Sequence, residues 1–174
     1  IYNAMMATLN EGDEVIVPAP YWVSYPDMVL LAGGTPIILE CTEKQGFKIN
    51  PSELEKIITK KTKWIILNSP SNPTGACYSE KDIREIAKVL EKHPHVYILS
   101  DDIYEHITYE SFKFFTIAQI GSLKDRVLTM NGVSKAYSMT GWRIGYAAGP
   151  SEIIKAIAKI QSQSTTNPSS ISQA

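Results

Sequence analysis

The sequence predicts an α/β fold built on a mostly parallel sheet with helices on both faces. Short apolar runs of strand length alternate with amphipathic stretches of helix length along the chain, and this alternation is typical of parallel sheets. Several of the runs are apolar on both sides, as buried parallel strands are. With 174 residues, of which 44% are hydrophobic, the chain is long enough for one domain with a packed core.

The chain opens with a helix, a strand, a second helix and a second strand. Residues 1–9 have the pattern of the second half of a helix, although no capping residue precedes them. "DEVIVPAP" (13–20) is a short apolar strand closed by prolines, and "YWVSYPDMVLLAGG" (21–34) has the length and the glycine stop of a helix entered through a turn. "TPIILE" (35–40) predicts the next strand.

The middle of the chain continues the alternation. "NPSELEKII" (50–58) predicts a helix capped by Asn50 or Ser52, because either side chain can accept a hydrogen bond from a free amide of the first turn. "TKWIILNSP" (62–70) is apolar on both faces and predicts a fully buried strand. "SEKDIREIAKVLEKH" (79–93) begins with a serine N-cap and places its apolar residues on one helical face.

The last part of the chain adds three strands and a helix. "VYILSDD" (96–102) and "RVLTMNG" (126–132) have the composition of buried strands. "WRIGYAAGP" (142–150) predicts a third strand of the same kind, and "SEIIKAIAKIQSQ" (151–163) predicts a closing amphipathic helix.

Composition and charge exclude several classes of partner. The formal net charge is -1 and the basic residues are scattered, so neither nucleic acid nor an anionic membrane surface is expected as a partner. There is no uninterrupted apolar stretch of membrane-spanning length and no basic-then-apolar leader. Cys41 and Cys77 are too few and too isolated for a disulfide framework or a metal knuckle. These features together predict a protein of the cytoplasm.

Three of the predicted strands are followed by polar segments. These segments are "NSPSNPTG", "SDDIYEH" and "NGVSK". In parallel sheets, ligands bind beyond the carboxyl ends of the strands, where the loops converge. Asn72, held in a turn by the proline that follows it, and Asp101, at the end of an apolar strand, are therefore candidate site residues.

Both candidates also have plainer interpretations. Asn72 belongs to ordinary turn chemistry, because asparagine, proline and glycine form turns in any protein. The pair of Asp101 and Asp102 is compatible with a metal site or with acid and base chemistry, but no histidine or cysteine lies at ligand spacing. Asp102 is also a candidate cap of the next turn. Asp101, closer to the buried strand, is better placed to hold a cationic partner.

Lys135 is the third candidate. Most lysines are solvated surface groups, but Lys135 follows Ser134 just beyond a buried strand. Arg143 lies eight residues further on, in a run that is otherwise apolar. An arginine in a buried strand needs an anion, and a phosphate group suits its planar, forked guanidinium. The sequence contains no GxGxxG motif and no Walker loop.

Four segments taken together resemble the pyridoxal-phosphate-dependent aminotransferases of fold-type I, with bacterial aspartate aminotransferases the nearest likeness. The segments are "PAPYWVSYPDMV", "NSPSNPTG", "SDDIYE" and "SKAYSMTGWRIGYAAGP", and the likeness extends over essentially the whole chain. It implies a cytoplasmic enzyme that uses pyridoxal 5′-phosphate to move the amino group of an L-amino acid, expected to be aspartate, to 2-oxoglutarate. It also implies a homodimer in the full-length form.

The resemblance assigns catalytic roles to three residues. Lys135 would form the Schiff base with the cofactor's aldehyde and later move the proton from the substrate's Cα. Asp101 would pair with the pyridine nitrogen and keep it protonated, which makes the ring an electron sink. Tyr104 would hydrogen-bond the phenolic oxygen of the ring.

It also assigns roles in binding. Asn72 would share the phenolic oxygen and touch the substrate carboxylate, and Trp22 would stack on the ring near the substrate. Arg143 would grip the phosphate. Many relatives have a serine three residues before the lysine as a phosphate ligand, whereas this sequence has Gly132 there, and Ser134 is the candidate substitute.

The resemblance is to part of the family's length. It implies that residues 1–174 are an incomplete large cofactor-binding domain, without the phosphate-binding loop that precedes it in the family and without the C-terminal small domain. A chain of this extent would not transaminate alone. Two alternatives share the same core residues: a pyridoxal-phosphate-dependent carbon–sulfur lyase, and an aminotransferase-like effector domain of a transcription regulator.

Overall fold

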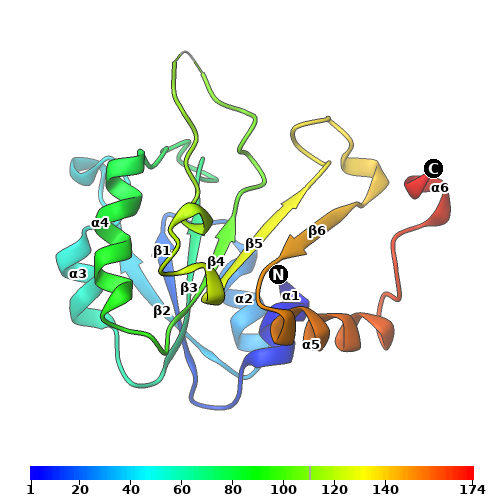
Figure 1. Cartoon of the computed structure of the whole chain (residues 1–174), viewed down its shortest axis with the longest axis horizontal. Helices are drawn as coiled ribbons and strands as arrows, with labels where there is room; N and C mark the ends of the chain where they lie inside the picture. Colours follow the sequence, from blue (N-terminus) through cyan, green and yellow to red (C-terminus); the bar gives the residue numbers. More distant parts are fainter. Residues whose placement is uncertain (110) are drawn as a thin grey trace.

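A computed structural model describes residues 1–109 and 111–174, and in this part of the chain it forms one six-stranded sheet in the order β2-β1-β3-β4-β5-β6. The first five strands are parallel, and β6 runs antiparallel to β5 (Figure 1). The strands are β1 (Glu14–Ala19), β2 (Thr35–Glu40), β3 (Thr62–Asn68), β4 (Tyr97–Asp101), β5 (Val127–Gly132) and β6 (Gly145–Ala148).

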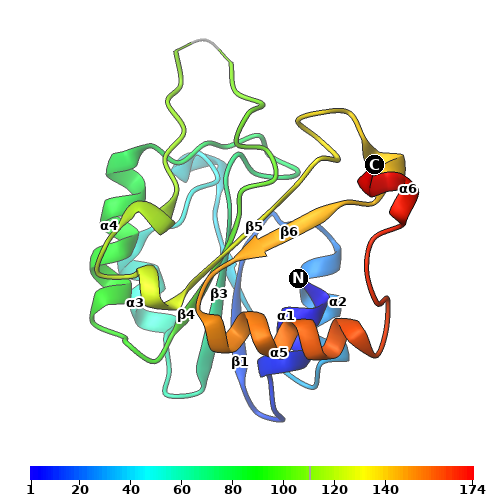
Figure 2. The same ribbon diagram turned by 45° about the vertical axis from the view of Figure 1, so that its right-hand side comes forward.

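Helices cover both faces of this sheet. The α-helices are α1 (Tyr2–Thr8), α2 (Ser24–Leu31), α3 (Pro51–Ile57), α4 (Glu80–Glu91), α5 (Ser151–Ser162) and α6 (Ser170–Gln173). Figures 1 and 2 show α3 and α4 on one face and α1, α2 and α5 on the other. The fold class predicted from the alternation of strands and helices is therefore confirmed.

The central strands bury both of their faces, as their apolar sequences predict. In β1, Ile16 belongs to the core beneath α3 and α4, whereas Val15 and Val17 belong to the core beneath α1, α2 and α5. In β3, Ile65 and Trp64 divide in the same way. Successive side chains of a strand point to opposite faces, so a run that is apolar at every position supplies two cores at once.

The predicted helix caps are confirmed. The Asn50 side chain accepts a hydrogen bond from the Ser52 amide at 2.9 Å, so the first of the two candidates is the N-cap of α3. Ser79 caps α4, and its hydroxyl and amide both donate to the Asp82 carboxylate at 2.9 Å in a capping box. These local contacts fix where each helix begins, and therefore where each preceding loop ends.

The prediction of a buried strand over residues 142–150 is wrong in two respects. The strand β6 covers only Gly145–Ala148 and its residues are mostly exposed. Arg143 precedes the strand, is exposed, and has a left-handed backbone with φ of 56°. The reason is that an apolar run indicates a strand but not its place in a sheet, and β6 pairs only with β5 in the part of the chain described. The argument that burial forces Arg143 to bind an anion therefore fails.

In Figure 1 the arrowheads of β4 and β5 point toward the upper edge of the sheet. The loops that follow these strands carry the candidate residues of the sequence, so this edge is where a site is expected. Among the described residues, no helix combines the length and the hydrophobicity that crossing a membrane requires.

Candidate active site

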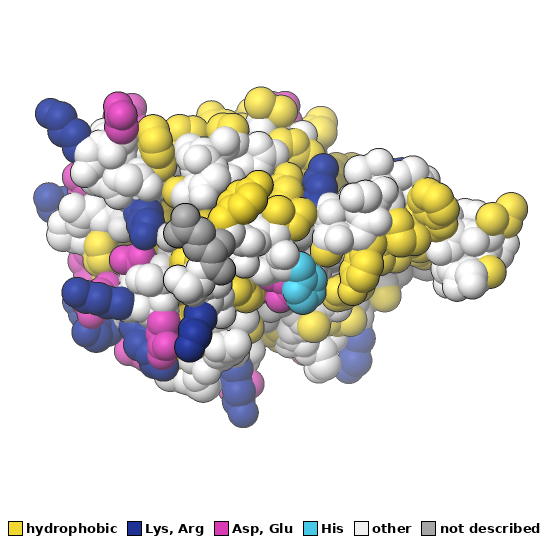
Figure 3. Space-filling model, turned by 90° about the horizontal axis from the view of Figure 1, so that it is seen from above, with side chains coloured by type: hydrophobic (Ala, Val, Ile, Leu, Met, Phe, Trp, Pro, Cys, Tyr) yellow, Lys and Arg dark blue, Asp and Glu magenta, His cyan; other side chains and the backbone are white. Residues whose placement is uncertain are grey.

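A cavity of about 300 Å³ lies at the carboxyl ends of β3, β4 and β5, a volume within the range of small-molecule sites. All seven residues selected from the sequence line it, although they come from five separate segments. They are Trp22, Asn72, Asp101, Tyr104, Ser134, Lys135 and Arg143. Figure 3 views the molecule from this edge: hydrophobic side chains spread over its centre and right, and most charged side chains lie at its left.

Asp101 provides the buried charge of the cavity. It is the last residue of β4 and only 7% exposed. The Tyr25 hydroxyl donates to its Oδ2 at 2.6 Å, and the Ile103 amide donates to its Oδ1 at 3.4 Å. Burial raises the pKa of the Asp101 carboxyl, and the hydrogen bond from Tyr25 opposes that rise. A cation placed beside Asp101 would therefore be attracted to a carboxylate that has lost most of its water.

Two asparagines tie the turn after β3 to Asp101. The Asn68 side-chain amide donates to the backbone oxygen of Asp101 at 2.9 Å, and its side-chain oxygen accepts from the Asn72 amide at 2.8 Å. One side chain thus bonds the end of β4 and the turn that carries Asn72. The Asn72 side chain lies close enough to Tyr104 to lower the pKa of its phenol, so Asn72, Asp101 and Tyr104 line the cavity side by side.

Tyr104 lies in the turn after β4, where its phenol is half-buried. Burial raises the pKa of this phenol, the nearby Asp101 carboxylate raises it further, and the nearby Asn72 side chain acts in the opposite direction. Tyr104 therefore keeps its proton at neutral pH and can donate a hydrogen bond into the cavity.

Trp22 and Tyr25 form an aromatic corner beside Asp101. Their rings meet edge to face, with centroids 5.4 Å apart and planes at 87°, a favoured aromatic geometry. Tyr25 is buried, whereas Trp22 is 39% exposed. The indole thus remains available to a flat ligand, while the phenol holds the carboxylate.

Lys135 lies in the loop that follows β5, where it is exposed and lines the cavity together with Ser134. Arg143 lies later in the same connection between β5 and β6, and its Nη1 donates to the Thr140 backbone oxygen at 2.8 Å. Two basic side chains and a buried carboxylate therefore line one cavity. Such a cavity suits a ligand that is itself charged at two places.

The structure accounts for Gly132 at a position where the resemblance leads one to expect serine. A Cβ atom on Gly132 would lie 2.8 Å from the Ile144 oxygen and 3.2 Å from the Gly145 Cα, closer than side chains approach backbone. The strands β5 and β6 leave no room there. Ser134, two residues later, has a half-buried side chain that lines the cavity.

Sequence reasoning missed Tyr25 and Asn68. Both lie in segments that the sequence had marked, but neither was assigned a role. Tyr25 is 76 positions from the Asp101 carboxylate that it contacts, so no local pattern could pair them. Asn68 carried one usable signal, because a polar residue at the end of an otherwise apolar strand is unusual.

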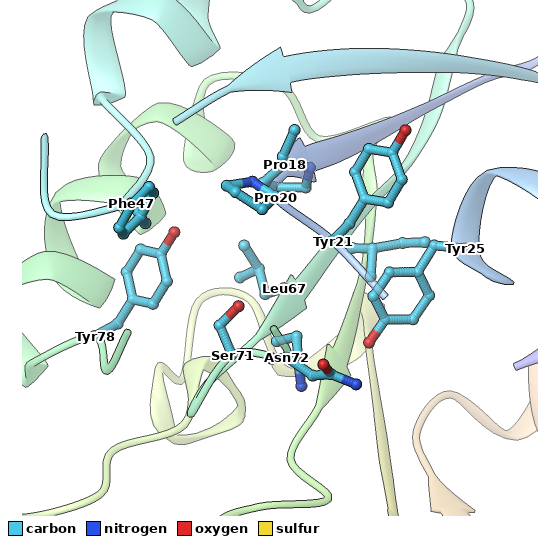
Figure 4. A pocket seen from close by; sticks show the side chains of 12 residues that line it. Pro18, Pro20, Tyr21, Tyr25, Phe47, Leu67, Ser71, Asn72 and Tyr78 are labelled. Atoms are coloured by element: carbon cyan, nitrogen blue, oxygen red, sulfur yellow. The ribbon is translucent and has the colours of Figure 1, made fainter. Parts of the chain in front are cut away.

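A much smaller hollow of about 20 Å³ lies behind the Asn72 turn. Figure 4 shows Phe47 and Tyr78 on one side of it and Tyr21 and Tyr25 on the other. It shares Tyr25, Asn68 and Asn72 with the larger cavity. A hollow of this size holds about one water molecule, so it is too small for a substrate-sized ligand.

Asp102 points away from the cavity. Its carboxylate accepts a hydrogen bond from the Ser100 hydroxyl at 2.7 Å and lies close to Thr116. Burial raises the pKa of this carboxyl to about 6. Asp102 therefore does not cap the next turn through its side chain, because that carboxylate bonds residues beneath the opposite face of the sheet.

The sequence profile described as aminotransferase class I and II matches residues 1–174 of the chain. The chain belongs to this aminotransferase family. Among its curated relatives, a probable aspartate/prephenate aminotransferase of Rickettsia bellii is 66% identical over 99% of this chain, and the match covers 44% of the relative. The aspartate/prephenate aminotransferase of Cereibacter sphaeroides is 63% identical, again over 99% of this chain and 44% of the relative.

Solved aminotransferase structures agree with this assignment. The crystal structure of the aspartate aminotransferase from Rhizobium meliloti superimposes with a TM-score of 0.97 at 58% identity, covering 99% of this chain and 43% of that one. The aspartate aminotransferase from Thermus thermophilus, solved with maleate, gives a TM-score of 0.94 at 46% identity, covering 99% of this chain and 44% of that one. The chain spans less than half the length of the aminotransferases that it matches.

Proposed function

We propose that the chain is the large cofactor-binding part of a pyridoxal-phosphate-dependent aminotransferase that moves the amino group of aspartate to 2-oxoglutarate. The observation that carries the proposal is the single cavity lined by all seven residues that the resemblance assigns to such a site. The names of the relatives support aspartate as the amino donor. The Thermus relative was solved with maleate, which is a dicarboxylate like aspartate and 2-oxoglutarate.

The residues of the cavity fit the charges of this cofactor. Asp101 is buried and its carboxyl has a raised pKa, so a protonated ring nitrogen beside it would restore the stabilisation that burial removes. Arg143 and Ser134 offer a guanidinium and a hydroxyl for the phosphate. Lys135 offers the amine that the aldehyde requires. The carboxylate and the basic side chains that line the cavity thus match the charged groups of one molecule.

When bound, pyridoxal 5′-phosphate supplies an aldehyde that takes up an amino group and a ring that accepts the electron pair left at the substrate's Cα. Asp101 would keep a proton on the ring nitrogen, which is the condition for that electron uptake. Tyr104 and Asn72 would offer hydrogen bonds to the ring's phenolic oxygen, and Trp22 would offer an aromatic face to the ring.

Lys135 would supply the amine that holds the cofactor's aldehyde and, once freed, the base that takes the proton from the substrate's Cα and gives a proton back. Because Lys135 lies on an exposed loop, the amine can move without repacking the core.

The rest of the aminotransferase is expected to lie outside these 174 residues. We infer that residues 1–174 make up an incomplete large domain, and that the parent protein also supplies a phosphate-binding loop and a small domain. We further infer that the full-length protein is a homodimer in the cytoplasm. The length of the relatives supports the first inference, because this chain covers 44% of the Rickettsia protein.

The test is an absorbance spectrum of the purified chain with pyridoxal 5′-phosphate, before and after borohydride. We expect a band that borohydride removes, and a covalent label that peptide mapping places on Lys135. Lys135→Ala should abolish both. Lys155→Ala is the matched control, because Lys155 is an exposed lysine that pairs with Glu152 on α5.

Assays of the full-length protein distinguish an aminotransferase from a carbon–sulfur lyase. Aminotransfer from aspartate to 2-oxoglutarate should yield glutamate and oxaloacetate, and prephenate, which the relatives' names include, should be assayed as a second acceptor. A carbon–sulfur lyase would instead release pyruvate and ammonia without consuming an oxo acid. Absence of the Lys135 label in both the chain and the full-length protein would contradict the proposal.

A further inference from the structure

Glu105 links the turn that follows β4 to the end of the neighbouring strand β5. Its Oε1 accepts a hydrogen bond from the Asn131 side-chain amide at 2.6 Å. Glu105 directly follows Tyr104 in the turn after β4, and its own amide donates to the Asp102 oxygen at 2.9 Å. A hydrogen bond to an ionised acceptor is stronger than one between neutral groups, so this contact is a firm link between the turn and β5.

Asn131 transmits that link to the Lys135 loop. Its Oδ1 accepts from the Gly132 amide at 2.8 Å, so Glu105 binds one end of the Asn131 amide and the next peptide group binds the other. Asn131 lies four positions before Lys135 and lines the same cavity. Asn131 and Gly132 also pair with Tyr146 and Gly145 of β6, so the Asn131 side chain joins the turn after β4 to a strand end that is held on its other side.

Backbone contacts also join the two segments, but they involve residues that precede Glu105 and Asn131 in the chain. The Asp102 amide donates to the Met130 oxygen at 2.9 Å. A Cβ atom on Gly132 would lie 3.3 Å from the Ile103 side chain, which shows how near the two segments approach. Glu105 is the residue that continues this contact beyond the end of the paired strands, toward the part that carries Lys135.

Glu105 could instead serve only in a surface ion pair with His106. The distances favour its contact with Asn131. The His106 Nε2 lies 3.3 Å from the same oxygen that receives the Asn131 amide at 2.6 Å. The His106 side chain is 62% exposed and that of Glu105 only 27%. Exposed ion pairs contribute little, so the carboxylate is held mainly by its inward bond.

We propose that Glu105 is a positioning residue for Lys135. Through the Asn131 amide, its carboxylate holds the Lys135 loop against the turn that follows Asp101 and bears Tyr104, so that one bound molecule can touch Lys135, Asp101 and Tyr104. The inference rests on the proposed function, because it concerns how Lys135 meets the cofactor's aldehyde. A misplaced amine reacts slowly even when the binding cavity is intact.

The test compares Glu105→Ala and Glu105→Gln in the full chain, each also combined with Asn131→Ala. Two quantities are measured: the rate at which pyridoxal 5′-phosphate forms a borohydride-reducible adduct on Lys135, and hydrogen exchange of the peptide that contains residues 131–135. Glu85→Ala is the matched control, because Glu85 forms a comparable 2.7 Å contact with Lys88 on the exposed face of α4. Thermal unfolding of each variant reports whether it is folded.

We expect Glu105→Ala to slow adduct formation about tenfold and to raise exchange in residues 131–135, because the loop loses its anchor. Glu105→Gln keeps a carbonyl oxygen for Asn131 and should stay within about threefold of the unchanged chain. In the Asn131→Ala background, Glu105→Ala should add less than about twofold, because the two residues act through one contact.

Three results would overturn the inference. One is a rate for Glu105→Ala equal to that of the Glu85→Ala control. Another is an equal effect of Glu105→Ala with and without Asn131, since Glu105 would then act by some other route. The third is a loss of rate with unchanged exchange in residues 131–135. If neither the unchanged chain nor the full-length protein forms an adduct on Lys135, the proposed function falls, and this inference falls with it.

Discussion

At the scale of single residues, two neighbouring aspartates have opposite environments. Asp101 faces the cavity and receives a hydrogen bond from Tyr25, whereas Asp102 faces the other side of the sheet and receives one from Ser100. Successive residues of an extended strand point to opposite faces. Burial raises the pKa of both carboxyls. Only the Asp101 carboxylate, which faces the cavity, can be stabilised by a bound cationic ligand.

Tyr25→Phe should weaken cofactor binding near neutral pH. The Tyr25 hydrogen bond lowers the pKa of Asp101 against the effect of burial, so its loss lets this pKa rise further and leaves less carboxylate to hold a protonated ring. We expect the affinity for pyridoxal 5′-phosphate to fall about tenfold at about pH 7, with a smaller loss at about pH 9, because a bond to a charged group contributes roughly 1.5–3 kcal/mol.

Fluorescence titration with the cofactor at both pH values measures this effect. Tyr21→Phe is the matched control, because Tyr21 borders only the smaller hollow and should leave both affinities unchanged. A loss for Tyr25→Phe that is the same at the two pH values would show that Tyr25 acts by shape and not through Asp101.

Asp102→Asn should stabilise the chain more as pH rises. Burial raises the folded-state pKa of Asp102 from 3.8 to about 6, so between these values the folded protein holds a proton that the unfolded chain has released. Stability therefore falls as pH increases through this window, by about 3 kcal/mol in total. Asparagine carries no such proton and keeps an oxygen for Ser100.

Urea unfolding of Asp102→Asn and of the unchanged chain at about pH 4 and pH 7 measures this difference in stability. A difference that is the same at the two pH values would contradict the prediction.

At the scale of elements, α4 is secured at both ends by side chains. Ser79 and Asp82 close its first turn. At the other end, the Arg126 guanidinium donates to the backbone oxygens of Leu90, His93 and Val96 at 2.6 to 3.0 Å. Leu90 belongs to α4, whereas His93 and Val96 lie in the loop that leads to β4, so this arginine, which comes just before β5, joins the end of α4 to the sheet.

Arg126→Ala should destabilise the chain by roughly 2–4 kcal/mol, because three partly buried carbonyl groups lose a charged donor. Arg84→Ala is the matched control: Arg84 lies on the exposed side of α4, where it pairs with Glu80, and its loss should cost less than about 1 kcal/mol. Chemical unfolding of both variants measures the difference. Equal losses would mean that the contacts of Arg126 contribute no more than a surface ion pair.

At the scale of the whole molecule, the cavity is assembled from loops at one edge of a sheet. The chain covers less than half of the length of its aminotransferase relatives. Under the proposed function, its residues would supply the lysine, the ring partner and an arginine, whereas gripping the substrate would also need groups from the rest of the protein.

The 174-residue chain should therefore bind pyridoxal 5′-phosphate without catalysing aminotransfer, whereas the full-length protein should do both. A coupled assay of oxaloacetate formation from aspartate and 2-oxoglutarate, run at equal concentrations of Lys135 adduct, compares them. We expect the rate of the chain to be lower by at least about a thousandfold, since positioning of the substrate contributes on this scale. Comparable rates would show that the large domain alone is sufficient.

The sequence by itself determined the fold class, the order of elements, the caps of α3 and α4, and the candidate residues at the strand ends. These features depend on local patterns: the spacing of apolar residues, the side chains at helix starts, and motifs a few residues long. The resemblance of four such motifs then assigned roles to Lys135, Asp101 and their neighbours. Their location around one cavity agrees with those roles.

Only the tertiary structure decided which residues meet. Tyr25 reaches Asp101 across 76 positions, and Glu105 reaches Asn131 across 26, because strand order brings distant loops to one edge of the sheet. The structure also placed Arg143 on an exposed turn and not in a buried strand, since an apolar run does not reveal whether a strand is central or at an edge. Composition and spacing specify the elements, but contacts between them depend on how the whole sheet is assembled.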